Sequence, residues 1–383
     1  MKRVDTGIAN GPGHGVAAAA LLVLIAGAAC SAGQASRGRI AERIDLLLSK
    51  EYGGDQPGAA VYVSRGGNVI LDKGYGLADT ARKAPVTTDT VFRLASLTKM
   101  FTATAILMLA GKNQIALDDP VKKFLPEASA SWTQIRIKNL LSHTAGLADY
   151  LDRPDSVAWA GREYSVPDLL DAFRNKPMSF APGEKAVYSN SNYILLGAVI
   201  ERVSGVPFAR FVKTNIFELL GMTGTRCDGR FEEAPGLAIA YEPARMPDGG
   251  LDWNRLLVAR PYTMSSLYTA GACVSSVGDL VRFHDGLARG AVVARRELAE
   301  SFEPVRLADG SAGTMSAGGW QIDPVLGRRA LMRGGALPGV CTWFLMMPEE
   351  PILVVLLTNR SPGMPRCGLL AVQIAGIVAG GRN

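Results

Sequence analysis

The sequence predicts an α/β (α+β) fold built around one antiparallel sheet. Segments with strand character lie near both ends of the chain, at residues 59–76 and again between residues 318 and 359. The part between them, about residues 96–288, is mostly helical in pattern and is broken by Pro- and Gly-containing loops. This order indicates a sheet assembled from both chain ends and flanked by helices, with a mostly helical subdomain inserted.

The first strand-like segment reads "AAVYVSRGGNVILDKGYG", and its apolar residues alternate on both sides of Gly66-Gly67. Alternation around a Gly-Gly pair predicts a β-hairpin. Residues 40–51 before it have helical spacing. Towards the C-terminus, strands are expected in "GGWQIDP", "RRALMRGG", "VCTWFLMMP" and "PILVVLLTN", and an apolar helix is expected over 366–379.

Helices of the middle part are expected at 97–111, 136–142, 167–175, 190–204, 207–220 and 276–288. The sheet subdomain would then comprise about residues 37–95 and 289–383, and the helical subdomain about residues 96–288. A catalytic cleft is expected where the two meet, because ligand pockets favour such seams.

The composition is that of an ordinary globular protein, with 48% hydrophobic and 20% charged residues in 383. The net charge of +6 is mild, and Lys and Arg are scattered rather than clustered. Nucleic acid is therefore not expected as a partner.

The N-terminus resembles a targeting segment. Lys2 and Arg3 precede an apolar stretch, Val16–Ala29, that is short and rich in Ala. This pattern predicts a signal peptide over residues 1–29 and export to the periplasm or the outside of the cell. Cys30 follows directly and matches the end of a lipobox, although Gly27 stands where Leu is usual, so lipid attachment at Cys30 is a second option. An uncleaved N-terminal anchor is a third.

Four cysteines remain after such processing, namely Cys227, Cys273, Cys341 and Cys367. They can pair in three ways, which the sequence leaves open. The chain has 3 His and no C-x-x-C spacing, so neither a metal site nor another cofactor is expected. His143 is interpreted as a structural loop residue.

A serine and a lysine stand at the start of an apolar helix, in "LASLTKMFTATAILMLAG". Ser96 and Lys99 are three residues apart and therefore share a helix face. A lysine in an apolar seam can have its pKa lowered enough to accept a proton from a serine hydroxyl. By chance alone the motif would mean little, but its place at the buried start of a helix favours a nucleophile and its base.

Two further motifs have catalytic interpretations. Tyr188 and Asn190 precede an apolar helix, where a phenol can carry protons and an amide can orient a lysine. The alternative is a turn tyrosine and a helix N-cap. The Gly-rich stretch "MRGGALPGV" allows backbone N–H groups to approach a substrate and, with the N–H of Ser96, to form an oxyanion hole.

The order of these motifs resembles the penicillin-recognising serine hydrolases: class C β-lactamases, D-alanyl-D-alanine carboxypeptidases and related esterases. The resemblance extends from about Pro57 to Asn359 and includes the stretches "LLSHTAGLADY", "PGEKAVYSNSNYILLG" and "IFELLGMTGT". It implies a β-lactamase/transpeptidase-like fold, with Ser96 as the acylating nucleophile and Lys99 as its base. It also implies that Tyr188 carries protons and that Asn190 positions Lys99 and the substrate amide.

The resemblance places Arg333-Gly334-Gly335 at the family's third motif, where Lys or His precedes Ser, Thr or Gly and a final Gly. Arg333 and Gly335 would then bind substrate, and the N–H of Ala336 would complete the oxyanion hole. Asn359 matches a substrate-contacting asparagine. Arg333 cannot deprotonate, and Gly334 lacks the hydroxyl that grips a substrate carboxylate in relatives, which weakens the case for efficient β-lactam hydrolysis.

The sequence therefore predicts an exported serine hydrolase that acts on a small-molecule or peptide substrate through an acyl-enzyme. A cell-wall peptide or a β-lactam is the first expectation, and an ester of a small acyl group is the second. A non-catalytic peptidoglycan-binding protein is the third. A membrane partner is expected only through a lipid anchor.

Overall fold

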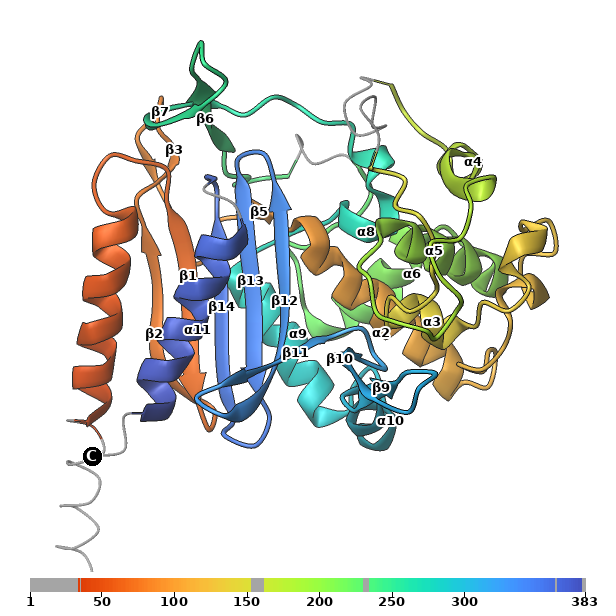
Figure 1. The fold of residues 1–383 in the computed structure, drawn as a ribbon. Coiled ribbons are helices and arrows are strands. Elements are labelled where there is room, and N and C mark those ends of the chain that lie inside the picture. The colour runs from red at the N-terminus through yellow and green to blue at the C-terminus, as the bar shows by residue number, and fades with distance from the viewer. Residues whose placement is uncertain (1–33, 35, 153–161, 230–233, 362–363, 381–383) are drawn as a thin grey trace, which may run out of the picture.

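The computed structural model describes residues 34, 36–152, 162–229, 234–361 and 364–380. In this part of the chain the main sheet has the strand order β2-β1-β14-β13-β12-β11-β10-β9, with every neighbouring pair antiparallel (Figure 1). The strands are β1 (Ala59–Arg65), β2 (Asn68–Tyr75), β9 (Pro304–Arg306), β10 (Ala312–Ser316), β11 (Gln321–Val325), β12 (Arg328–Leu337), β13 (Val340–Met347) and β14 (Ile352–Thr358).

The two chain ends meet in the sheet, as the sequence predicted. Strand β1 pairs with β14 from Ala59↔Thr358 to Arg65↔Ile352. The β1–β2 hairpin turns at Gly66 and Gly67, whose φ angles are 57° and 76°. Two positive φ angles are what a two-residue hairpin turn compatible with strand twist requires, so the Gly-Gly pair determines the turn.

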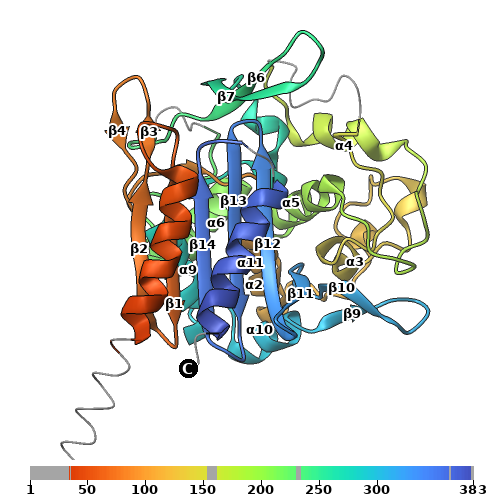
Figure 2. The ribbon, with the colours of Figure 1, turned by 60° about the vertical axis from the view of Figure 1, so that its left-hand side comes forward.

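Helices cover both faces of the sheet (Figure 2). Along β14 the alternate residues Ile352, Val354 and Leu356 pack in a core with the N-terminal helix (residues 36–52) and α11 (Met364–Gly380). The intervening residues of β14 belong to a second core with α2 (Thr98–Gly111) and α9 (Val277–Arg289). Burial on both faces explains why β13 and β14 are apolar apart from one threonine each.

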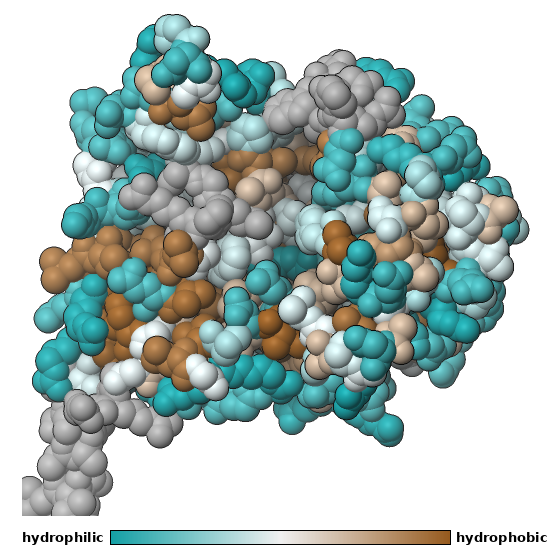
Figure 3. Space-filling model, in the orientation of Figure 1, coloured by the Kyte–Doolittle hydropathy of each residue, from teal (hydrophilic) through white to brown (hydrophobic). Residues whose placement is uncertain are grey.

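Apolar residues also reach the surface over the outer helix layer, on the left of Figure 3. Leu46 on the N-terminal helix is 72% exposed and Leu369 on α11 is 70% exposed. Among the described residues, no helix is both long and apolar enough to cross a membrane.

The middle of the chain is helical, as predicted. Its helices are α3 (Ile137–Leu141), α4 (Val166–Arg174), α5 (Asn190–Ser204), α6 (Phe208–Val212), α7 (Glu218–Leu220) and α8 (Tyr268–Gly271), and short 3-10 turns lie at Val121–Lys123, Ala130–Trp132 and Met264–Ser266. A π-helical turn, Lys213–Phe217, joins α6 to α7 within the single helix expected there. The residue bounds proposed for the two subdomains stay a prediction.

Some elements were not predicted. A hairpin of β6 (Tyr241–Arg245) and β7 (Leu251–Val258) lies within the part expected to be helical. Its exposed apolar residues, such as Trp253 at 48%, give no clean inward–outward alternation to read from the sequence. The helix α10 (Arg295–Ser301) and the short pairs β3–β4 (Leu77–Asp79, Ala84–Pro85) and β5–β8 (Phe92–Arg93, Val274–Ser275) were also not expected.

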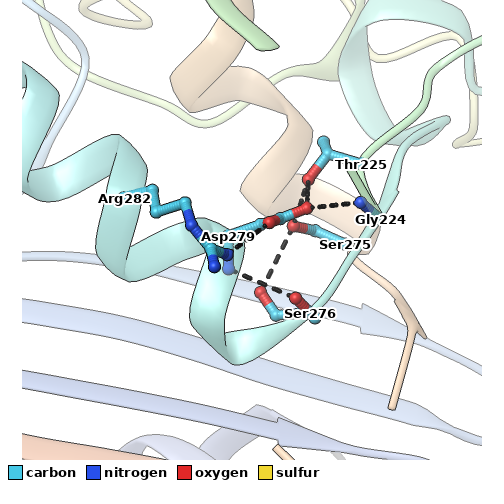
Figure 4. A network of polar contacts seen from close by, with 6 residues as sticks. All are labelled: Gly224, Thr225, Ser275, Ser276, Asp279 and Arg282. Carbon is cyan, nitrogen blue, oxygen red and sulfur yellow. Dashed lines mark hydrogen bonds and ion pairs between the residues drawn. The ribbon is translucent and has the colours of Figure 1, made fainter. Parts of the chain in front are cut away.

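A disulfide and a buried carboxylate fix the chain next to α9. Cys227 and Cys273 form the disulfide, whereas Cys341 and Cys367 are buried and not disulfide-bonded, so one pair of the four cysteines is joined rather than two. Asp279 on α9 is 1% exposed and joins α9 to the loop before Cys227 (Figure 4). Its Oδ2 accepts hydrogen bonds from the Gly224 N–H and the Thr225 hydroxyl, and its Oδ1 pairs with Arg282.

Candidate active site

Ser96 lies where the sheet meets the helices. It belongs to a 3-10 turn, η1 (Ala95–Leu97), directly before α2. Ala95 has a φ of 49°, in the left-handed region that residues with a Cβ disfavour. This strained turn leads the chain from β5 into the helix. It leaves Ser96 at the positive end of the α2 dipole, where negative charge on its oxygen is stabilised.

Gly335 lets strand β12 approach this turn closely. A Cβ at Gly335 would lie 2.4 Å from the Leu94 carbonyl oxygen, 2.4 Å from the Thr342 hydroxyl and 3.0 Å from the Ser96 nitrogen. The Thr342 hydroxyl also donates a hydrogen bond to the Leu94 carbonyl at 2.8 Å. Gly335 packs behind the nucleophile, between the lining residues Gly334 and Ala336, and its predicted contact with substrate stays a prediction.

Lys99 is fully buried, and its hydrogen-bond partners determine where its lone pair points. Its Nζ donates to Asn190 Oδ1 at 2.9 Å and to the Ala270 carbonyl at 2.7 Å, and it lies 3.1 Å from Ser96 Oγ. A neutral amine has two hydrogens. When both point to these two oxygens, the lone pair faces Ser96 Oγ and can accept its proton.

The surroundings of Lys99 favour that neutral form. Burial holds the pKa of Lys99 well below its usual value, and the Arg333 guanidinium lowers it further, while Asp149 opposes both. The nearby imidazole of His143 is also buried, and burial together with Arg333 and Lys99 keeps its pKa well below the usual range. His143 is therefore neutral and adds no positive charge.

Tyr188 places its hydroxyl 2.7 Å from Ser96 Oγ and 3.3 Å from Asn190 Oδ1. The residue is 48% exposed toward the cleft, but its hydroxyl end is enclosed by these partners. Burial raises the pKa of Tyr188 to about 12, although the Ser96 hydrogen bond and Arg333 both lower it. The phenol is therefore protonated at neutral pH and is a proton donor. Its ring stacks on His143 with 4.5 Å between ring centres.

Arg333, on β12, is a buried cation at the cleft. It is 5% exposed, and its Nη2 donates to the Tyr193 hydroxyl at 3.3 Å. Its Nε is buried without a hydrogen-bond partner, and no carboxylate of the described residues forms an ion pair with it. A guanidinium left in this state favours an anionic group from outside the chain.

Ser96, Tyr188 and Arg333 line one cleft of about 270 Å³. Ala336 lines it together with Ser96, as the predicted oxyanion hole requires. The polar lining also includes Tyr188, Asn190, Gln321 and Arg333, and large apolar side chains complete the wall: Leu151, Leu267, Met315, Met332 and Leu337. The site therefore combines a nucleophile, one cation and an apolar wall.

A model of the Beta-lactamase family matches residues 42–377, which is most of the chain. The chain belongs to the Beta-lactamase family. Within this family it is a serine hydrolase. Such an enzyme needs a serine hydroxyl beside groups that exchange protons with it, and Ser96 Oγ lies within hydrogen-bond distance of both Lys99 and Tyr188.

Several proteins of known identity are similar to this Beta-lactamase family member. A penicillin-binding protein of Bacillus subtilis (strain 168) is 31% identical over 315 residues, which cover 78% of this chain and 67% of the relative. Esterase EstB of Burkholderia gladioli is 36% identical over 213 residues, which cover 50% of this chain and 53% of EstB. The crystal structure of D-amino acid amidase from Ochrobactrum anthropi SV3 has a TM-score of 0.76 at 22% identity and covers 91% of this chain and 99% of that one, which shows a shared fold.

The structure places Asn359 outside the cleft of this family member. Asn359 is 2% exposed, and its Oδ1 accepts from the Gly58 N–H at 2.7 Å. Its Nδ2 donates to the carbonyls of Leu77, Ala78 and Ile239. Because backbone groups engage the whole amide, the predicted substrate contact of Asn359 is corrected to a structural role. Cys30 lies outside the described residues.

Two residues of the site were not predicted from the sequence. Asp149 binds Asn190, and Tyr193 supports Arg333. Tyr193 follows Asn190 by three residues, so helical spacing alone could have placed it on the same face. Asp149 is in "LLSHTAGLADY", where no spacing rule connects it to α5. No group of three or more His, Cys, Asp or Glu in the described part of the chain is placed to hold a metal ion.

Proposed function

We propose that this serine hydrolase cleaves amide or ester bonds of substrates that carry a carboxylate near the scissile carbonyl. The observation that supports this substrate class is Arg333, a buried cation at the cleft that has no anionic partner among the residues the structure describes. β-Lactams and peptides ending in D-alanine both carry such a carboxylate. The apolar wall of the cleft suits an acyl group with an apolar side chain.

The arrangement supports a mechanism in two steps. In the first, Lys99 accepts the Ser96 proton while the serine oxygen attacks the carbonyl, and the oxyanion faces the N–H groups of Ser96 and Ala336. The bond to the leaving group then breaks, Tyr188 donates a proton to that group, and the proton held by Lys99 restores the phenol. In the second step water attacks the acyl-enzyme, and its proton returns to Ser96 Oγ.

Incubation with benzylpenicillin, followed by intact-protein mass spectrometry and peptide mapping, tests the proposal. We expect a penicilloyl adduct on Ser96 that the variant Ser96→Ala does not form. Arg333→Met should form the adduct more slowly, because it removes the charge that attracts the carboxylate. The lifetime of the adduct separates a peptidase, which deacylates slowly, from a lactamase.

A small-acyl esterase is the second candidate. Gly334 provides no hydroxyl for a carboxylate, and the relative EstB is an esterase. Hydrolysis of a p-nitrophenyl ester, without a penicilloyl adduct and without any effect of Arg333→Met, would favour this candidate. The intact arrangement around Lys99 argues against a purely binding role, because a buried lysine is costly without a chemical use.

We also propose that the protein is exported. The disulfide between Cys227 and Cys273 supports this, because such bonds persist in oxidising compartments. The mass of the mature N-terminus after expression in a bacterial host tests both options: cleavage near residue 29 supports secretion, and a diacylglycerol on Cys30 supports a lipid anchor. An intact N-terminus in the cytosol would contradict export.

A further inference from the structure

We propose that Asp149 is a positioning residue that fixes the orientation of the Asn190 amide and thereby directs the Lys99 lone pair to Ser96. This inference rests on the proposed function, because it concerns the base of the acylation step. It extends the site to a residue that does not line the cleft but hydrogen-bonds Asn190, which does.

The contacts of Asp149 allow only one orientation of the amide. Its Oδ2 accepts hydrogen bonds from the backbone N–H of Asn190 at 2.9 Å and from Asn190 Nδ2 at 2.8 Å. A carboxylate accepts hydrogen bonds and cannot donate them, so the amide nitrogen must face Asp149. Asn190 Oδ1 is consequently turned the other way, toward Lys99 Nζ at 2.9 Å.

The backbone holds Asp149 in place at the start of α5. Asn190 is the first residue of α5, and the preceding Ser189 makes no side-chain capping bond. Asp149 supplies that cap from 41 residues earlier in the chain, where a negative charge also favours the helix dipole. On both sides of it the chain is tied to Ser191, whose hydroxyl donates to the Ala148 carbonyl and accepts from the Tyr150 N–H.

The charge of Asp149 also acts on Lys99. The titratable and charged groups around Lys99 come from four parts of the fold: Tyr188 before α5, Tyr193 on α5, Arg333 on β12, and His143 and Asp149 in the segment after α3. Arg333 lowers the pKa of Lys99 and Asp149 raises it. Loss of the Asp149 charge should therefore lower the pKa of Lys99 further.

The variant Asp149→Asn separates orientation from packing, because it is nearly the same size. An asparagine can donate as well as accept, so the Asn190 amide is free to turn over and present Nδ2 to Lys99. An N–H in that place would bind the lone pair that Ser96 needs. Asp149→Glu keeps an acceptor-only charged group and should retain most of the rate.

The test measures labelling of Ser96 by a fluorophosphonate, which reacts with activated serines whatever the natural substrate, from pH 5 to 10 by intact mass. We expect Asp149→Asn to react about 10- to 100-fold more slowly on the plateau. The acid limb of its pH–rate profile should move to lower pH, because the Asp149 charge that raises the pKa of Lys99 is gone. The matched control is Asp168→Asn, which changes another carboxylate at a helix N-terminus, in α4 and far from Lys99 in sequence, and should leave both readouts unchanged.

The outcomes are distinct. A wild-type rate in Asp149→Asn would overturn the inference, as would a slower rate with an unmoved acid limb and no rescue by Asp149→Glu, since that result indicates general disorder. Failure of the wild-type protein to be labelled at Ser96 would instead overturn the proposed function, and the inference with it.

Discussion

At the scale of single residues, the charge of Lys99 has the largest effect on the proposed acylation of Ser96. Because burial and Arg333 depress its pKa, Lys99 becomes neutral at a lower pH than a free lysine does. We expect the single-turnover acylation rate to rise with pH as Lys99 loses its proton, and to reach its plateau below the usual lysine pKa. Acid should abolish acylation by protonating the base.

The variant Lys99→Arg also tests whether Lys99 acts as the base, because a guanidinium keeps its proton at every pH from 5 to 10. We expect it to lose about a thousandfold or more of the acylation rate at every pH. If Lys99→Arg acylated at the wild-type rate, Lys99 would serve only as a hydrogen-bond donor. The fall of the acylation rate in acid would then have to come from the protonation of another group.

Gly335 is the second decisive position, for steric reasons. In Gly335→Ala the new methyl would lie 2.4 Å from both the Leu94 carbonyl oxygen and the Thr342 hydroxyl. We expect β12 to separate from the Ser96 turn, with a loss of about 1–3 kcal/mol of stability and most of the acylation rate. Thermal unfolding and Ser96 labelling measure both. Gly111→Ala, at the end of α2 with nothing within 4 Å, is the control and should lower neither the stability nor the labelling rate.

Much of the site could be predicted from the sequence because its chemistry lies in short motifs. Ser96 in η1 and Lys99 in the first turn of α2 are three residues apart along continuous helical backbone, so their spacing was enough to pair them. The left-handed turn at Ala95 and the reach of Asp149 to Asn190 depend on how loops close, and residue types alone do not specify that. Asn359 shows the converse, since the right residue type stands outside the cleft.

At the scale of elements, the attachment of α9 to the loop before Cys227 depends on the carboxylate of Asp279. In Asp279→Ala the Gly224 N–H and the Thr225 hydroxyl lose their acceptor, and the loop before Cys227 is released (Figure 4). We expect a loss of about 2–3 kcal/mol, measured by urea unfolding. Asp285→Ala, on the same helix but with a side chain that is 52% exposed, should change stability by less than about 0.5 kcal/mol. Equal losses in the two variants would contradict a special role for the network.

The elements that were predicted correctly are those whose apolar residues face a core. Strands β13 and β14 and helices α2 and α5 are buried along most of their length, and their apolar runs showed it. The β6–β7 hairpin could not be found in the same way, because β7 leaves Leu257 and Val258 at 45% and 66% exposed. A strand that packs against few other residues shows no regular alternation of apolar and polar side chains.

For the whole molecule, strands at both ends of the chain were enough to predict a shared sheet. They did not give the order of its strands, because periodicity shows which face is buried but not which strand is the neighbour. The pairing of β1 with β14 brings together residues about three hundred positions apart. That pairing places the N-terminal helix beside α11 on one face and leaves the other face for α2 and Ser96.

The Cys227–Cys273 disulfide adds stability to this whole assembly. It closes a loop with a sequence separation of 46, which in the chain-entropy treatment corresponds to about 4 kcal/mol as an upper value. We expect a reductant to lower the unfolding midpoint in urea, by about 2–4 kcal/mol in free energy. The double variant Cys227→Ser/Cys273→Ser should start at the lower value and not respond to reductant. Equal midpoints with and without reductant, in protein shown by mass to be reduced, would mean that the packing of α8 and α9 already holds Cys227 and Cys273 together.

The other two cysteines, Cys341 and Cys367, are buried, and burial raises the pKa of the Cys367 thiol. Both should therefore resist alkylation until the protein unfolds.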